Sequence, residues 1–478
     1  MESCSDFAFT VANGSRRAFG AYAAVIALFL CALLSKGTVL VLPAVLLVVD
    51  LWPLRRVRDA RTLVAAAIEK GPLLALSVVF ARVAVWGQQW IPGLMASWTE
   101  HTLGERVLQA FFGLVFYVRK TILPDGLAPI YELPDALRLA DPRYYLSIAA
   151  VAAGTAILFF WRRRAPALLA AGAAYAIAVA PVLGFSQAGP QIAADRYTYL
   201  ACLPFALLAG AAVVRWRGHA AKAAAVAVLA VLAVLTGLTF AQTRVWRSSA
   251  ALWEHAIALD PDAVLNNLNL GHVRARQAER TADRSAQAAL LDESQRLFEH
   301  GLRIREDPLL LAGIALVHQH RWELDPKNRS AEAELSLEFA RRALEVAKQR
   351  NLETPDYHLN LGSALGNAQH PNDALAEFQT YVRERPSSYL GHYLLGFALL
   401  QASRFSESVR ELGQAVDLEP GSVNGWGNLG IAQEKLGEKD LAIQAYQRVL
   451  ALAPGHPTAK QHLFLLQSRM SVDVVPNK

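Results

Sequence analysis

NGWGNLGIAQEKLGEKDLAIQAYQRVLALAP, residues 424–454, is the stretch that decides the fold of the C-terminal half of the chain. It contains two predicted helices and a stop signal, and the residues expected to pack or end them are Trp426, Leu429, Gly430, Ala442, Tyr446 and Pro454. Glycine and alanine let two antiparallel helices approach closely, an aromatic ring fills the gap to the next pair, and proline ends a helix. The stretch therefore predicts a helix pair that stacks on a neighbouring pair.

The same pattern recurs upstream at a spacing of 34 residues. The recurring positions are Pro386, Pro420 and Pro454, with the Leu-Gly pairs Leu361-Gly362, Leu395-Gly396 and Leu429-Gly430. A period of 34 is typical of tetratricopeptide (TPR) repeats. The phrase WEHAIALDP at 253–261, followed by NNLNLG at 266–271, resembles the same unit, and 274–352 is expected to hold two more units with inserted residues. We therefore expect five to six repeats from Ser248, closed by a cap helix at about Pro457–Arg469.

The N-terminal half has a different composition from the repeats. Of the 478 residues, 54% are hydrophobic and only 18% are charged, which is too apolar for an ordinary soluble chain. Apolar runs of membrane-spanning length continue to about Gln242, and charged residues recur every few positions after that point. These features predict an all-α protein with a membrane domain over 1–243, a TPR solenoid over 244–470 and a disordered tail over 471–478.

The basic loops indicate how the apolar runs cross the membrane. The runs expected to cross are Phe19–Leu34, Val39–Trp52, Gly71–Trp86, Tyr144–Trp161, Pro166–Phe185, Tyr199–Trp216 and Ala223–Ala241. An eighth run, Leu103–Leu123, carries Glu105, Arg106, Arg119 and Lys120 and is a poor span. If this run lies in the interface or re-enters, the basic clusters at 55–61, 162–164 and 215–222 all face the cytoplasm, as the positive-inside tendency requires. Seven spans then place the repeats outside the cytoplasm.

Composition also excludes several classes of function. The net charge of +6 comes largely from basic residues in loops beside spans, where they set topology, so we expect no nucleic-acid partner. The three cysteines provide neither a disulfide framework nor a zinc spacing, and no histidine pair, Walker loop or Ser-His-Asp pattern is present. We expect neither a metal nor another cofactor, and the sequence contains no motif for a divalent ion.

The candidate binding residues lie in short polar segments between apolar runs. The loop 186–200, SQAGPQIAADRYTYL, carries Asp195, Arg196 and Tyr197 at the edge of the predicted hydrocarbon. A charge pair in that position is costly unless it has a partner or a role. Two readings remain open: the loop binds a lipid phosphate, or Asp195 and Arg196 form an interfacial ion pair.

Three further charged residues carry paired readings of the same kind. Arg82, midway along a predicted span, either binds a carrier phosphate or extends to the membrane surface. Lys36 either lies near a carrier lipid or is only solvated. Asp50 is expected to cap its helix or to pair with Arg55 or Arg56.

Four phrases together resemble a known family. They are LLSKGTVLVLPAVLLVVDLWPL at 33–54, YVRKTILPDGLAPIYELP at 117–134, AADRYTYLACLP at 193–204 and TRVWRSSAALWEHAIALDP at 243–261. In this order they resemble bacterial relatives of the transmembrane and TPR repeat-containing O-mannosyltransferases, whose membrane domain is similar to GT-C glycosyltransferases. The resemblance implies transfer of a sugar from a polyprenyl phosphate carrier to an acceptor outside the cytoplasm. It also implies lipid-phosphate or donor binding by Asp195, Arg196, Tyr197, Arg82 and Lys36.

One departure from the family pattern concerns the catalytic residue. The resemblance implies further spans and an acidic extracytoplasmic loop ahead of LLSKG, whereas about thirty residues precede it here and Glu2 and Asp6 are the only early acids. The chain therefore resembles a member without its N-terminal portion, and the catalytic residue is unknown. The alternative function is a non-catalytic, membrane-tethered TPR scaffold for envelope proteins. Both readings imply a bacterial inner-membrane protein with a protein or peptide partner on the concave TPR face.

Overall fold

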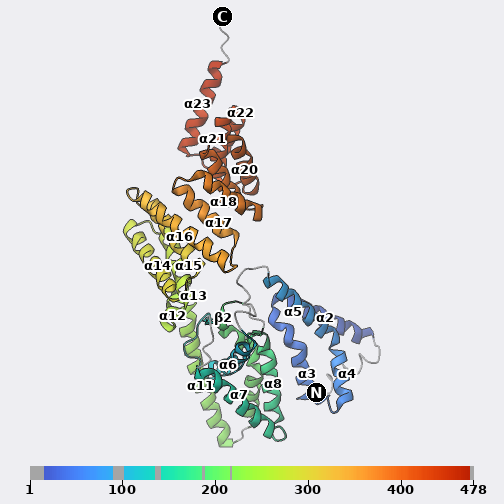
Figure 1. The fold of residues 1–478 in the computed structure, drawn as a ribbon. Helices are drawn as coiled ribbons and strands as arrows, with labels where there is room; N and C mark the ends of the chain where they lie inside the picture. The colour runs from blue at the N-terminus through green and yellow to red at the C-terminus, as the bar shows by residue number, and fades with distance from the viewer. Residues whose placement is uncertain (1–15, 90–101, 135–140, 186–188, 216–217, 474–478) are drawn as a thin grey trace. The chain divides into compact units, whose positions relative to one another are not determined.

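Helices make up most of the described residues in the computed structural model (Figure 1). The structure describes residues 16–89, 102–134, 141–185, 189–215 and 218–473. By its internal contacts the chain divides into two units, Met1–Leu259 and Asp260–Lys478. This division lies later than the boundary expected at 243/244, because the helix Ser249–Leu259 groups with the first unit.

In its described residues the first unit has helices and one pair of very short strands. Its helices are α2 (Arg16–Ser35), η1 (Gly37–Val41), α3 (Leu42–Leu51), α4 (Ala60–Glu69), α5 (Gly71–Gln89), α6 (Leu103–Ile122), α7 (Pro142–Phe160), α8 (Pro166–Val179), η2 (Ala180–Val182), η3 (Asp195–Tyr197), α9 (Thr198–Ala201), α10 (Leu203–Arg215), α11 (Gly218–Val245) and α12 (Ser249–Leu259). Strands β1 (Tyr131–Glu132) and β2 (Gln191–Ala193) pair antiparallel. The expected all-α architecture is thus observed with this small exception.

Among the described residues, three helices of the first unit are long and apolar enough to cross a membrane. They cover Gly71–Gln88, Pro142–Phe160 and Ala221–Val245, and a pair bent by 52°, Asp195–Ala201 with Leu203–Arg215, would add a fourth if it crosses as one span. The remaining apolar helices are shorter, namely Phe19–Ser35, Gly37–Leu51 and Pro166–Val182. Part of the run 39–52 belongs to the 3-10 turn η1, and α3 begins only at Leu42. Pro43 lies in the first turn of α3, where a residue without a backbone N–H is tolerated. Hydropathy does not reveal this change of helix type.

A small core holds the polar loop of the first unit against two helices. Tyr117 of α6 and Val179 of α8 are fully buried, and they pack with Ala193 of β2. The Tyr175 hydroxyl donates to the Leu114 carbonyl at 2.6 Å, which ties α8 to α6. The backbone around Asp195 is therefore anchored rather than free.

The second unit consists of stacked helix pairs followed by a last helix. The pairs are α13 (Val264–Glu279) with α14 (Arg284–Ile304), α15 (Pro308–Leu324) with α16 (Arg329–Gln349), α17 (Pro355–Asn367) with α18 (Pro371–Glu384), α19 (Tyr389–Gln401) with α20 (Phe405–Leu418) and α21 (Val423–Leu436) with α22 (Lys439–Leu452), and α23 (Pro457–Asp473) follows. The inserted residues expected between 274 and 352 lengthen the second helices, since α14 and α16 have 21 residues and α18 has 14.

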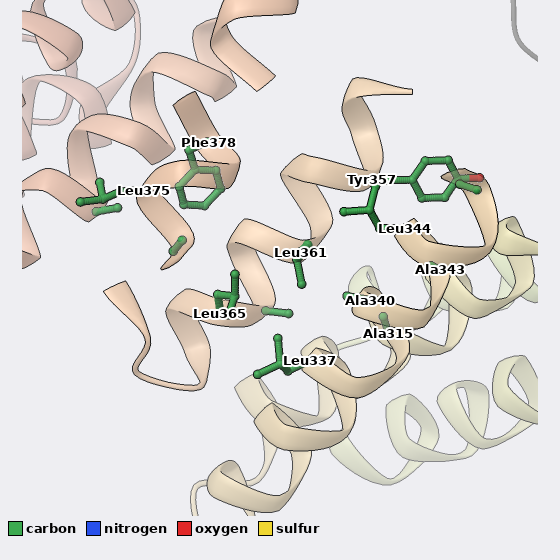
Figure 2. Packing of buried hydrophobic residues seen from close by; sticks show 14 of the residues in the cluster. Ala315, Leu337, Ala340, Ala343, Leu344, Tyr357, Leu361, Leu365, Leu375 and Phe378 are labelled. Carbon is green, nitrogen blue, oxygen red and sulfur yellow. The ribbon is translucent and has the colours of Figure 1, made fainter. Parts of the chain in front are cut away.

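Glycines allow the close approach of the two helices within a pair. A Cβ atom on Gly362 would lie 2.7 Å from the ring of Phe378, and one on Gly430 would lie 2.8 Å from the ring of Tyr446. Gly396 is equally close to Leu412. Figure 2 shows the core between pairs, where Leu361 and Leu365 of α17 lie between residues of α16 and α18.

The other predicted packing residues occupy matching places in successive repeats. Leu361, Leu395, Leu429, Ala442 and Tyr446 are buried. Pro386, Pro420 and Pro454 each lie two residues beyond the end of the preceding helix, and Trp426 is half-buried at the start of α21.

Two consecutive repeats also share the hydrogen bonds at their starts. Ser388 and Ser422 cap α19 and α21, accepting from the backbone N–H groups of Gly391 and Gly425. His392 and Trp426 place a ring nitrogen 2.9 Å and 3.0 Å from the carbonyl oxygens of Pro386 and Pro420. Histidine and tryptophan thus fill one structural position 34 residues apart.

The C-terminal cap helix is longer than predicted. Helix α23 continues to Asp473, so residues 471–473, which were expected to belong to a disordered tail, are helical. No glycine or proline between residues 458 and 475 would end the helix earlier. The rest of that tail, 474–478, lies outside the described residues.

First and second helices of the repeats have different neighbours. Each first helix contacts the first helix of the next pair, from α13 with α15 through to α19 with α21, and no comparable contact joins successive second helices in the part described. Helices on the inside of a curved solenoid lie closer together than those outside. The first helices therefore line the concave face.

Candidate functional site

The polar loop at Asp195 is held by hydrogen bonds to the segment that leads into β1. The Asp195 carboxylate accepts from the backbone N–H of Ala128 at 3.0 Å and from the Tyr131 hydroxyl at 3.2 Å. Arg196 donates to the Pro129 carbonyl at 3.2 Å and lies over the ring of Tyr197, 5.0 Å from its centroid. Within the described chain Asp195 and Arg196 do not form an ion pair with each other, so the interfacial-pair reading is wrong in that form.

Lys120 and Tyr131 complete this cluster beneath the loop. The Lys120 ammonium lies 5.2 Å from the centroid of the Tyr131 ring and donates to the Gly126 carbonyl at 3.1 Å. Burial lowers the pKa of Lys120, and burial together with the Asp195 carboxylate raises the pKa of Tyr131. The Tyr131 hydroxyl therefore keeps its proton and acts as a donor to Asp195.

Three of the five predicted binding residues line one small cavity. Lys36, Arg196 and Tyr197 surround a space of about 50 Å³ together with Tyr199. Lys36 is exposed at the start of η1, and Arg196 is also exposed. Two cations and two phenol rings from segments 160 residues apart in the chain thus face one space.

A larger apolar cavity adjoins this small one. Its volume is about 530 Å³, and it lies among η1 and α3, α8, and α10. The two cavities share Thr38, Val41, Ala178 and Leu200. Its size falls in the usual range for small-molecule sites, roughly 300–1,000 Å³. A cationic end beside an apolar space suits a ligand with an anionic head and a hydrocarbon chain.

The other charged residues discussed from the sequence, Arg82 and Asp50, lie elsewhere. Arg82 is exposed on α5 and does not line either cavity. Asp50 is buried and pairs with Arg56 at 3.0 Å and with Lys70 at 2.5 Å. The expected pairing of Asp50 with Arg56 is confirmed, and its role is structural.

The basic residues of α6 lie on the run that was expected to lie in the membrane interface or to re-enter, and two of the three are buried against protein. Arg106 is buried and donates to the Gly184 and Phe185 carbonyls at 3.1 and 3.3 Å. Lys120 is buried as described above, and only Arg119 is exposed, paired with Asp125 at 2.7 Å. Charges predicted for the membrane surface instead hold loops onto α6.

The sequence interpretation missed an aromatic stripe on the concave face. Tyr389, Tyr393 and Phe397 of α19 stack in sequence, with centroids 5.7 and 6.4 Å apart and interplanar angles of 18° and 11°. Their spacing of four residues puts them on one side of the helix, and the buried residues of α19, such as Leu395 and Leu399, occupy the other. The four-residue spacing of these aromatic residues in the sequence could have predicted the stripe. We call these three residues the aromatic stripe.

Metal binding has no support in the described ranges. In those parts of the chain no three histidine, cysteine, aspartate or glutamate side chains gather to hold an ion.

The comparisons with known proteins concern the second unit. Residues 359–409 and 393–457 match the family model of the tetratricopeptide repeat. The chloroplastic TPR domain-containing protein PYG7 of Arabidopsis thaliana is 32% identical over 78 residues, which is 16% of this chain and 26% of PYG7. The match thus spans about a quarter of that relative's length.

Two solved structures are similar to this chain at low identity. YrrB, described as a TPR protein with an unusual peptide-binding site, is 15% identical with a TM-score of 0.35, covering 44% of this chain and 97% of YrrB. MamA from Desulfovibrio magneticus RS-1 is 16% identical with a TM-score of 0.32, covering 40% and 97%. The 34-residue recurrence of the pairs from α17 to α22 and the family match together identify this part of the second unit as TPR repeats.

Proposed function

We propose that this chain is a membrane-anchored TPR scaffold whose concave face binds a segment of a partner protein. The observation that carries the proposal is the row of neighbouring first helices, which leaves side chains such as Asn360 and Phe397 exposed on the inner face. TPR repeats generally use such concave surfaces for binding.

Site-specific crosslinking in cells tests this role. A photo-reactive benzoylphenylalanine replaces Asn360 on α17, and the matched control replaces Gln379, an exposed amide on the second helix α18 of the same repeat. We expect one protein to be captured reproducibly at position 360 and not at 379. Equal capture at both positions, or none at 360, would contradict the proposal.

A second candidate function is the binding of a phosphate-bearing lipid by the first unit. The observation that favours it is the small cavity with Lys36 and Arg196 beside the apolar cavity of about 530 Å³. Charge-assisted hydrogen bonds from lysine and arginine are the usual means of holding phosphate. A polyprenyl phosphate carrier fits this description, and its use in sugar transfer to a protein or envelope acceptor is the form that the resemblance to O-mannosyltransferases implies. The catalytic residue of such a transfer is not identified.

Native mass spectrometry of the full chain in detergent micelles tests the lipid site. The probe is undecaprenyl phosphate, and undecaprenol lacks the phosphate. We expect the double variant Lys36→Gln, Arg196→Gln to retain about tenfold less undecaprenyl phosphate, since a hydrogen bond to a charged group is worth about 1.5–3 kcal/mol. Arg82→Gln removes an exposed cation outside the cavities and should have no effect. Equal retention of undecaprenol and its phosphate would refute the site.

We further propose a location in the bacterial inner membrane with the TPR unit outside the cytoplasm. The support is the position of the three basic clusters at 55–61, 162–164 and 215–222 in the sequence. All three lie on the cytoplasmic side only if the run 103–123 does not cross the membrane.

A further inference from the structure

The aromatic stripe lies on a helix without charged residues, α19, and the charged residues of the next first helix, Glu434 and Lys435 of α21, lie near the end of that helix. Helix α19, YLGHYLLGFALLQ, contains no lysine, arginine, aspartate or glutamate, and its one histidine, His392, is buried. On the preceding first helix, α17, the single charged residue is Asp356, which pairs with Arg385 at 2.9 Å. A charged ligand would lose water here and gain no partner. The surface therefore selects an uncharged one.

Hydrogen bonds to the next repeat fix the rings of the stripe. The Tyr389 hydroxyl lies 2.6 Å from the Ser422 hydroxyl, and the Tyr393 oxygen accepts from the Asn428 amide at 3.2 Å. Because Tyr393 accepts this bond, its own proton is left to donate to a ligand. Burial raises the pKa of Tyr393, so the hydroxyl is protonated at neutral pH. A carbonyl oxygen is the natural acceptor.

An open notch adjoins the stripe on α21. Gly427 lies 34 residues after Tyr393, at the matching place in the next repeat, and a Cβ atom there would meet no other atom within 4 Å. Its neighbour Asn428 holds the Tyr393 hydroxyl. Gly427 thus leaves open space at the position where a ring equivalent to that of Tyr393 would lie; we call this space the notch.

The size of the stripe limits the ligand. Eight residues of α-helix span about 12 Å at about 1.5 Å per residue. An extended polyproline II chain rises about 3.1 Å per residue, so about four of its residues fit along the stripe. Proline-containing segments in this conformation dock on aromatic-lined grooves, where rings contact the prolines and hydroxyls donate to the carbonyls.

From this geometry we propose that the aromatic stripe and the Gly427 notch bind an uncharged, proline-containing extended segment of the partner protein. The stripe supplies apolar ring surface, Tyr393 donates to a backbone carbonyl, and the notch receives an apolar side chain. This inference rests on the proposed partner-binding role and specifies the chemistry of the partner.

Fluorescence anisotropy with the full chain in detergent micelles tests the inference. The probe is a labelled decapeptide of proline, leucine and serine, and the comparison peptide has glutamate in place of leucine. We expect the first to bind and the second to bind at least about tenfold more weakly, because its charges would be buried without partners.

Two variants with matched controls locate the binding. Gly427→Glu fills the notch with a charge and should abolish binding, while Gly413→Glu, at an open helical glycine on the second helix α20, should not. Both changes raise helix propensity, so neither is expected to prevent folding. Tyr393→Phe removes the donor alone and should weaken binding roughly three- to tenfold.

The outcomes separate this inference from the proposed function. Loss of binding in Gly427→Glu but not in Gly413→Glu supports the stripe. Preference for the glutamate peptide, insensitivity to both glycine variants, or no binding of the proline peptide overturns the inference. In each of those cases crosslinking at position 360 still decides whether the concave face binds a partner at all.

Discussion

Gly430 has no side chain because the ring of Tyr446 occupies the space that one would need. A Cβ atom there would lie 2.8 Å from the ring, whereas one on Gly427, a turn away on the same helix, would meet nothing. We expect Gly430→Ala to destabilise the TPR unit by about 1–3 kcal/mol through overpacking. Gly427→Ala should stabilise it by up to about 1 kcal/mol, because alanine is the better helix former.

Thermal unfolding followed by circular dichroism checks this pair of glycine variants. The two substitutions add the same methyl group to the same helix, so helix propensity alone would shift both melting temperatures upward. A rise for Gly430→Ala would show that the contact with Tyr446 does not limit the position.

His272 makes the stability of the TPR unit depend on pH. Burial, with Arg276 nearby, lowers its pKa in the folded state, and its ring lies 5.1 Å from that of Phe298. The unfolded chain therefore binds a proton more readily, so this group costs stability as pH falls through its ordinary value of about 6.5.

We expect the urea midpoint of the TPR unit to drop between pH 7 and pH 5.5. His272→Gln removes this titration, so the drop should be smaller in the variant. An equal drop in both proteins would assign the pH dependence to other groups.

Among the elements, helix α6 holds two loops, one through Arg106 and one through Lys120. Arg106 near its start binds the carbonyls that follow η2, and Lys120 near its end binds the loop before β1. The helix thereby fixes both segments that meet at Asp195. Its charges explain why hydropathy rated it a poor span.

We expect Arg106→Gln to destabilise the first unit by about 1.5–3 kcal/mol, because buried carbonyls lose a charged donor. Arg119→Gln, on the same helix but exposed, removes a surface ion pair and should change stability by less than about 1 kcal/mol. Retention of the folded peak in size-exclusion chromatography after heating measures both. Similar losses for the two variants would contradict the anchoring role of Arg106.

The elements could be predicted where a short pattern determines them. The 34-residue spacing of glycines and prolines predicted the repeats and the packing of Gly362 and Gly430, since close approach of helices requires small residues. Hydropathy could not locate η1, because it records how apolar a run is and not which hydrogen bonds its backbone forms. Nor could spacing tell that Arg106 is buried, since that depends on carbonyls 78 residues away.

The candidate site could be predicted in part for similar reasons. Lys36, Arg196 and Tyr197 were selected by their position beside apolar runs, and they line one cavity. Arg82 was selected as a cation midway along a predicted span, and it lies apart from both cavities, because one-dimensional position does not give the side of a helix that faces its neighbours. The placing of Lys36 and Arg196 beside one cavity depends on the packing of α3 against α8, which no local pattern encodes.

At the scale of the whole molecule the main prediction concerns membrane topology. Three helices have spanning length, and a bent pair would make a fourth, so shorter apolar helices must also cross if the seven-span proposal holds. We expect alkaline phosphatase fused after Lys478 to be active and green fluorescent protein at the same site to be dark, since the TPR unit is proposed to lie outside the cytoplasm. A fluorescent, phosphatase-inactive pair of fusions would reverse the orientation.

The matching starts of two successive repeats bear on how such a chain changes length. Ser388 and Ser422 cap their helices in the same way, and the rings of His392 and Trp426 meet the same carbonyl of the preceding turn. Either repeat therefore offers its neighbours the same junction. A gene that gained or lost one 34-residue unit at this point would keep these cap and ring hydrogen bonds, so this part of the junction does not oppose a change in the number of repeats.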